Sequence, residues 1–252
     1  MQRVAAGNKI APCSSGASAD RIWNFKIAFQ VIHATSGEGK VSRRTLELTI
    51  DALNQAFAGQ DRCRHRACRT SSPSNLDTYY RFSMHKVEYH RSDRHFLECI
   101  DQWGLVWPKY NWKPDKYINV FICDSSKYLG IASFPWTQAS ERAISVHYDS
   151  LPGGRREAFN DGDTLVHEVG HAFGLFHTFE GGCSGHGQHG DPHGHTHGIG
   201  DFVADTPPEK TFAFGCPVGR NSCPNDRRED AIHNYMGALR PSLHTPACIR
   251  CL

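Results

Sequence analysis

The stretch HEVGHAFGLFH at residues 167–177 decides the fold class that this sequence predicts. Residues four apart lie on one face of a helix, so His167 and His171 can direct two imidazoles at the same ion. Gly174 can adopt the positive φ that ends a helix, and the chain can then fold back and bring His177 to that ion. Three neutral imidazoles suit zinc at about 2.0–2.1 Å and leave a fourth position open, which is typical of a catalytic site.

Glu168 follows the first histidine directly, where its carboxylate reaches a metal-bound water and not the metal itself. Zinc lowers the pKa of such a water toward about 7. We expect Glu168 to act as general base, accepting the proton as water attacks a peptide carbonyl and then passing it to the leaving amine. An amphipathic helix with solvated histidines is the alternative, but it leaves the glycine at the turn position unexplained.

The composition is that of a packed and nearly neutral protein. The 252 residues are 39% hydrophobic and carry a formal net charge of +2, so neither nucleic acid nor a membrane is expected as a partner. No apolar run approaches the ~20 residues that span a bilayer. The basic stretch at 61–69 is interpreted as an exposed loop, because no aromatic residues interleave with its charges.

Ten cysteines are scattered along the chain, and the spacing C-x-x-C occurs only between Cys248 and Cys251. This usage favours disulfides and an oxidising compartment, with a reduced protein carrying buried thiols as the alternative. Residues 1–20 contain no apolar segment, so the sequence shows no signal peptide. We expect these residues to be a disordered leader or the remnant of a prosegment.

Hydrophobic patterning predicts strands and helices up to the motif and irregular chain after it. Strands are expected at 24–32, 78–89, 116–123, 131–136 and 143–148. Helices are expected from an N-cap at Ser42 to Gly59 and over 163–176. Residues 184–200 form an insertion rich in glycine and histidine, interpreted as a flexible loop, with weak metal scavenging as the alternative.

The extended motif H-E-x-x-H-x-x-G-x-x-H resembles that of the metzincin metalloproteases. Asn-Tyr-Met at 234–236 looks like the Met-turn, whose methionine lies beneath the zinc site. Further segments resemble the pappalysin family, and its small secreted extracellular metalloproteases in particular: 134–136, 149–154, 171–183, 200–207 and 215–217. The resemblance covers roughly residues 22–58 and 78–236.

This resemblance implies an α+β fold of the metzincin-like zincin type. Its parts are a mixed, mostly parallel twisted sheet, an active-site helix, a backing helix and a loop-rich C-terminal subdomain. The catalytic domain would occupy 21–236, with subdomains at about 21–177 and 178–236, and a divergent tail would follow at 237–252.

The same resemblance implies an endopeptidase with one catalytic zinc ion, beneath which Met236 supports the site without binding the metal. It implies a disulfide between Cys183 and Cys216. It also implies calcium in the C-terminal subdomain, with Asp201 and Thr206 as contributors, and carboxylate and carbonyl oxygens do suit a hard cation. Ordinary turn residues beside prolines are an equal alternative for the aspartates of that segment.

We therefore expect a secreted, monomeric zinc endopeptidase that acts on protein or peptide substrates. Members of the family usually carry Asp-Tyr directly after the Met-turn methionine, whereas Gly237 and Ala238 follow here, and the tail to residue 252 replaces the closing helix. That tyrosine is thought to stabilise the oxyanion of the tetrahedral intermediate, so a catalytically impaired zinc-binding homologue is the alternative. A histidine-rich metal-storage protein is a second alternative.

Overall fold

The computed structural model describes residues 21–60, 77–157, 159–184, 201–213 and 217–237. Several sequence predictions concern residues outside these ranges: the leader at 1–20, the basic stretch at 61–69, the insertion beyond Ser184 and the tail from 238. Within the described ranges, no helix has both the length and the apolar character needed to cross a membrane.

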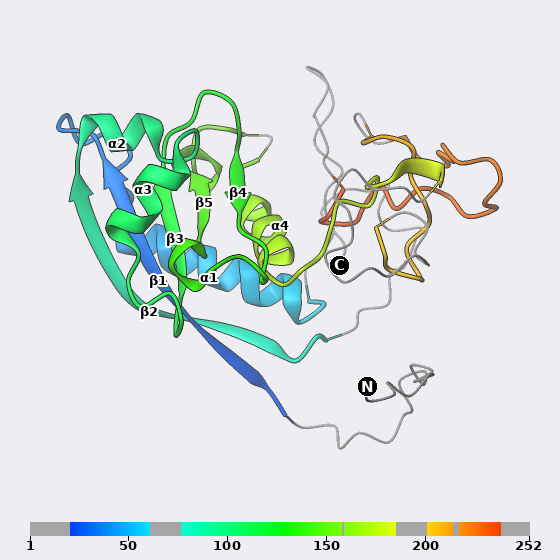
Figure 1. Ribbon diagram of the computed structural model, residues 1–252, viewed down its shortest axis with the longest axis horizontal. Helices are drawn as coiled ribbons and strands as arrows, with labels where there is room; N and C mark the ends of the chain where they lie inside the picture. Colours follow the sequence, from blue (N-terminus) through cyan, green and yellow to red (C-terminus); the bar gives the residue numbers. More distant parts are fainter. Residues whose placement is uncertain (1–20, 61–76, 158, 185–200, 214–216, 238–252) are drawn as a thin grey trace, which may run out of the picture.

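A mixed, 5-stranded sheet forms the centre of the N-terminal half (Figure 1). Its strands are β1 (Trp23–His33), β2 (Tyr80–Arg91), β3 (Ile118–Cys123), β4 (Gly130–Ala132) and β5 (Ile144–His147). The order across the sheet is β2-β1-β3-β5-β4, and all neighbours are parallel except β4, which runs antiparallel to β5. The predicted mostly parallel sheet is confirmed, and β4 is one of its edge strands.

Helices α1 (Arg43–Phe57) and α4 (Asp163–Ala172) pack on one face of this sheet. Ser42 caps α1 as predicted, because its hydroxyl accepts a 3.0 Å hydrogen bond from an amide of the first turn. Leu46 of α1 and Val169 of α4 belong to one apolar cluster with alternate residues of β1. The backing helix and the active-site helix therefore share a core, which fixes α4 relative to the sheet.

Two short helices that the sequence analysis did not predict cover the other face: α2 (Asp93–Glu98) and α3 (Trp103–Tyr110). They bury Phe96 and Trp107 in a second apolar cluster that contains Phe121 of β3. With 6 and 8 residues, these helices are too short to show helical periodicity in the sequence. Single 3-10 turns occupy Ala139–Glu141, Tyr148–Ser150 and Gly182–Ser184.

The strand predictions hold to within a few residues except at β4. A strand was expected over 131–136, whereas β4 ends at Ala132. Pro135 has no amide hydrogen to continue the ladder. The flanking rings of Phe134 and Trp136 instead stack on each other with centroids 4.7 Å apart, beside the end of α4.

Cysteines among the described residues form two disulfides, Cys99–Cys123 and Cys183–Cys223. The first ties the chain after α2 to the end of β3, and its pairing was not predicted. The second shows that the predicted Cys183–Cys216 pair is wrong, and Cys216 itself lies outside the described residues. The Cα atoms of Cys183 and Cys223 are 5.4 Å apart, a separation at which a disulfide closes readily.

The physical reason for this correction lies in the neighbouring backbone. Lys210 N donates a 2.9 Å hydrogen bond to the Ser222 hydroxyl, and Ser222 N donates a 3.0 Å bond to Asp230 Oδ1. These bonds hold Ser222, the residue before Cys223, in place, and Cys183 lies close enough to Cys223 to form the disulfide. No local spacing rule in the sequence could show this contact.

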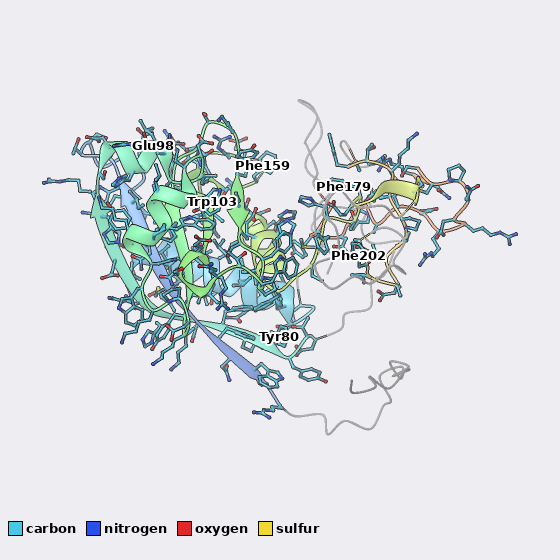
Figure 2. All side chains as sticks on the ribbon, in the orientation of Figure 1. Tyr80, Glu98, Trp103, Phe159, Phe179 and Phe202 are labelled. Atoms are coloured by element: carbon cyan, nitrogen blue, oxygen red, sulfur yellow. A yellow bond between two sulfur atoms is a disulfide. The ribbon has the colours of Figure 1, made fainter. Side chains whose placement is uncertain are left out.

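The chain after α4 carries turns, and its one regular element among the described residues is the 3-10 turn at Gly182–Ser184. Figure 2 shows Phe179 and Phe202 in this half, to one side of the sheet. A buried ion network stabilises it: Arg220 Nη1 lies 2.8 Å from Glu209 and 2.9 Å from Asp230. This half is the loop-rich part that the predicted fold requires.

Candidate active site

Helix α4 carries two of the three predicted zinc ligands, and the chain after it supplies the third. The Nε2 atom of His171 lies 3.1 Å from that of His167 and 3.2 Å from that of His177. The Nε2 atoms of His167 and His177 are also 3.2 Å apart. Nitrogens bound tetrahedrally to zinc at about 2.0–2.1 Å are separated by about 3.3 Å. The three nitrogens therefore form a triangle of the size that one zinc ion requires.

Backbone carbonyls orient two of these imidazoles. Nδ1 of His167 lies 2.6 Å from the Tyr235 carbonyl oxygen, and Nδ1 of His171 lies 2.8 Å from that of Leu175. A carbonyl oxygen only accepts, so each Nδ1 carries a hydrogen and each Nε2 presents a lone pair. Burial lowers the pKa of His167, and burial together with the nearby His167 lowers the pKa of His171 to about 4. Neutral imidazoles with converging lone pairs are the donor set of zinc, so these residues fit that metal.

Gly174 makes the turn that brings the third ligand back. Its φ is +98°, the left-handed conformation that the sequence analysis required of it. Gly174 N donates a 2.9 Å hydrogen bond to His171 O, and Leu175 N donates a 3.0 Å bond to Gly170 O. Helix α4 consequently ends at Ala172 and does not reach the predicted residue 176.

Glu168 is buried beside the ligands, with 5% of its surface exposed. Burial raises the pKa of its carboxyl group to about 8, because no cation in the described structure offsets the loss of solvation. A cation held by the adjacent histidines would favour the ionised carboxylate, which is the form that accepts a proton. The same carboxyl group packs against the backbone of Gly130 in β4.

The predicted Met-turn lies directly beneath the ligand helix. Asn234 N donates to Ala231 O at 2.9 Å, and Met236 N donates to the Asn234 side chain at 2.8 Å, which makes a tight turn. Met236 is 3% exposed. A methyl group added at Gly170 would overlap Met236 Sδ, so this glycine admits the methionine under the helix. Met236 therefore packs against the helix that carries His167 and His171.

A cavity of about 290 Å³ opens over the three histidines and Glu168. One wall comes from β4 and the segments on either side of it, and it is largely apolar. Tyr128, Phe134 and Phe176 contribute aromatic rings to the cavity, and Glu180 contributes a carboxylate. Phe134 contacts the ring of His171 edge to face, with centroids 5.6 Å apart. The cavity is therefore bounded by an edge strand and aromatic rings around the ligand group.

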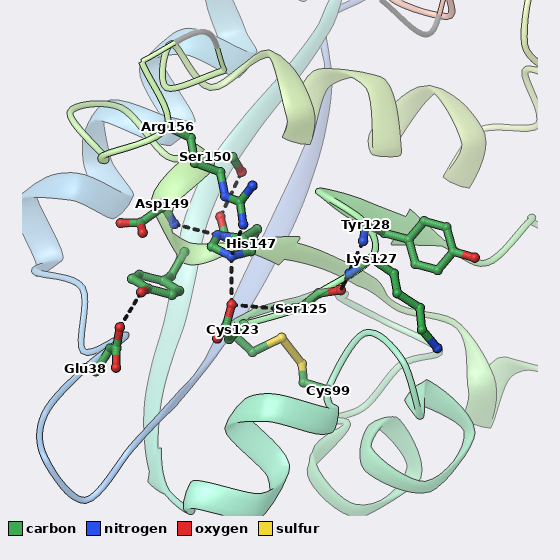
Figure 3. A network of polar contacts seen from close by, with 12 residues as sticks. Glu38, Cys99, Cys123, Ser125, Lys127, Tyr128, His147, Asp149, Ser150 and Arg156 are labelled. Atoms are coloured by element: carbon green, nitrogen blue, oxygen red, sulfur yellow. Dashed lines mark hydrogen bonds and ion pairs between the residues drawn. A yellow bond between two sulfur atoms is a disulfide. The ribbon is translucent and has the colours of Figure 1, made fainter. Parts of the chain in front are cut away.

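A polar network fixes the chain that leads into β4 (Figure 3). His147 Nε2 at the end of β5 lies 2.7 Å from Asp124 Oδ1. The Ser125 hydroxyl accepts hydrogen bonds of 3.1 Å from Lys127 N and Tyr128 N. Burial lowers the pKa of His147, despite the neighbouring carboxylate. This network holds the connection between β3 and β4 and so sets one edge of the cavity.

The two residues predicted to bind calcium lie together in a turn. Asp201 is 5% exposed, and its Oδ1 accepts a 3.0 Å hydrogen bond from Val203 N. Burial raises the pKa of Asp201, while the nearby Thr206 side chain favours the ionised form of this carboxyl group. These contacts fit a turn, and calcium binding stays a prediction.

Several contributors to the site were absent from the sequence analysis. The Tyr235 carbonyl orients His167, but a backbone atom carries no sequence signal. Gly130 adjoins the glutamate from β4, and a glycine within a short apolar segment could have indicated such a close approach. Phe134 lies against His171, whereas its segment had been interpreted only as part of a strand and as part of the family resemblance.

Three histidines around one ion position, with a buried glutamate beside them, define the class as a zinc hydrolase of the metzincin type. The chain matches the family described as "Pregnancy-associated plasma protein-A" over residues 106–239. An extracellular metalloprotease of Neurospora crassa is 32% identical over 223 residues, which are 84% of this chain and 66% of that protein. One from Verticillium alfalfae is 31% identical over 247 residues, 94% of this chain and 76% of that protein. The chain belongs to this pappalysin family of metalloproteases.

A solved structure supports the fold. Mature mirolysin of Tannerella forsythia, in complex with a cleaved peptide, has a TM-score of 0.72 at 21% identity and covers 92% of this chain and 88% of its own. This likeness confirms the metzincin-like architecture. The chain spans only 66% of the length of the Neurospora crassa relative.

Proposed function

We propose that this chain is a secreted zinc-dependent endopeptidase in which Glu168 is the general base. The observation that carries the proposal is the convergence of three Nε2 atoms within 3.2 Å of one another, beside a buried carboxyl group. Lone pairs brought this close repel one another unless a cation lies between them.

Each residue has a separate task. Zinc, when bound, would supply a Lewis acid that lowers the pKa of water and polarises a peptide carbonyl. His167, His171 and His177 would hold the ion through Nε2. Glu168 would accept a proton from water at a carboxylate oxygen and deliver it to the leaving nitrogen. Met236 would hold the ligand helix from below.

The substrate would be an extended protein or peptide segment. Strand β4 lies at the edge of the sheet and lines the cavity, so its outer backbone groups can pair with an added strand. Such pairing recognises backbone and not a particular side chain, which suits an endopeptidase. The carbonyl to be attacked would then lie over the three histidines.

Further parts of the proposal follow from the family and the disulfides. Relatives are named extracellular metalloproteases, and two described disulfides suit an oxidising compartment. The catalytic domain would span 21–236 and act as a monomer without nucleic acid or membrane. Calcium would bind at Asp201 and Thr206, where a buried carboxylate and a hydroxyl are already together.

The test is zinc analysis combined with hydrolysis of casein by the full chain and its variants. We expect one zinc ion per chain, hydrolysis by the wild type, and near-complete loss in Glu168→Ala with zinc retained. Glu47→Ala is the control, because this α1 glutamate pairs with the surface residues Arg43 and Arg44. Zinc binding without hydrolysis by the wild type would favour the impaired homologue. Several zinc ions per chain, with no effect of Glu168→Ala, would favour metal storage.

A further inference from the structure

Gly130, the first residue of β4, lies in contact with the Glu168 side chain. A methyl group placed on Gly130 would lie 2.5 Å from Glu168 Oε1, 2.7 Å from its Cγ and 2.9 Å from its Cδ. Carbon atoms of a side chain do not approach other heavy atoms this closely. We propose that Gly130 is a positioning residue for the general base: its missing side chain leaves the space that the Glu168 carboxyl group occupies.

Strand β4 cannot easily withdraw to relieve such an overlap. It pairs antiparallel with β5, with Gly130 opposite Val146. Next to this pair, His147 N donates a 2.7 Å hydrogen bond to Leu129 O. The connection before it is tied down by the turn at Ser125, whose side chain is among the buried polar groups. The edge strand is therefore tied to β5 at the residue that contacts the glutamate.

Helix α4 is fixed as well. Leu165, Val166 and Val169 are each at most 1% exposed and belong to the apolar cluster shared with α1 and the sheet. Moving the helix would also separate His167 from the Tyr235 carbonyl. A methyl group at position 130 would consequently displace the carboxyl group itself, because a side-chain rotation disturbs less than a shift of either backbone.

The consequence for catalysis rests on the proposed function. A general base must lie within hydrogen-bond reach of the proton that it accepts, and a misplacement of about 1 Å can lower the rate on the order of 100-fold. Gly130→Ala should therefore impair the proton transfer while the three histidines stay in place. If Gly130 were needed only for the stability of the sheet, Gly130→Ala would lower the melting temperature without selectively lowering the rate of proton transfer.

The first experiment compares Gly130→Ala with wild type and with Gly104→Ala, where an added methyl group meets no atom within 4 Å. We expect Gly130→Ala to keep one zinc ion and an unchanged KM, and to lose about 100-fold in kcat. Gly104→Ala should keep wild-type kcat. A kcat for Gly130→Ala within threefold of wild type would overturn the proposal.

The second experiment needs neither zinc nor activity and remains informative if the chain hydrolyses nothing. Melting temperatures of the metal-free protein are measured for Gly130→Ala in the wild-type background and in Glu168→Ala. We expect a decrease of a few degrees in the wild type and no decrease once the glutamate side chain is gone. Equal decreases in both backgrounds would refute the contact. An inactive wild type that shows the expected difference would refute the proposed function alone.

Discussion

Removal of the Cys183–Cys223 disulfide should destabilise the protein by an amount set by the loop that it closes. The two cysteines are 40 residues apart, and a cross-link of that span lowers the entropy of the unfolded chain by the equivalent of about 4 kcal/mol. Cys183 is exposed, so alanine there leaves no cavity in the core. We therefore expect Cys183→Ala to lower the free energy of unfolding by about 4 kcal/mol.

A double-mutant cycle identifies the partner. Cys183→Ala, Cys223→Ala and the double variant are unfolded in urea with free thiols blocked, and their free energies of unfolding are compared. Either single change removes the bridge, so the second change should add only about 1 kcal/mol or less for the packing of Cys223, which is 2% exposed. Additive losses for this pair, or strong coupling between Cys183 and Cys216 instead, would refute the assignment.

Three further predictions concern the turn, the polar network and the Met-turn. Gly174→Ala should destabilise the metal-free protein by about 1–2 kcal/mol and weaken zinc binding, measured by chelator competition, because alanine resists the φ of +98° on which His177 depends. Burial lowers the pKa of His147 below its ordinary 6.5, so as the pH falls the unfolded chain takes up a proton on this residue before the folded protein does. The free energy of unfolding should therefore decrease as the pH drops below about 6.5. Urea unfolding at several pH values should show a smaller decrease for His147→Gln. Gly170→Ala should be neutral or destabilising in the wild type, because the added methyl group overlaps Met236 Sδ. In Met236→Ala this overlap is absent, and calorimetry should show that Gly170→Ala stabilises the protein by about 1 kcal/mol.

Much of the fold could be predicted because its elements carry local patterns. The apolar run of β3 and the capped, amphipathic α1 both appear in the sequence at nearly their observed bounds. The helices α2 and α3 were missed because neither is long enough for periodicity to distinguish it from a loop. Strand β4 was placed too long because Pro135 ends pairing with β5, and that limit depends on a partner strand.

The same distinction applies to the candidate site: its local features could be predicted from the sequence, and its contacts between distant residues could not. The zinc ligands lie within one short segment, so helix geometry and one glycine sufficed to predict that three imidazoles converge. The disulfide partner of Cys183 and the contact between Gly130 and Glu168 join residues distant in the sequence. Such contacts depend on the packing of whole elements, so a sequence can at most mark Gly130 as a point of close approach and cannot identify the partner of either residue.

The ligand triangle itself depends on the loop-rich half. His167 donates to the Tyr235 carbonyl, and Thr178 N donates a 3.2 Å hydrogen bond to Met236 O, so both ends of the zinc motif are attached to the Met-turn. The Thr178 hydroxyl donates a 2.5 Å hydrogen bond to Glu209, whose charge is paired by Arg220. Because turns alone bury little apolar surface, this ion network and the disulfide must supply much of the rigidity there. We therefore expect zinc affinity to be coupled to the folding of this loop-rich half, and a change there that leaves the three histidines intact should still weaken metal binding.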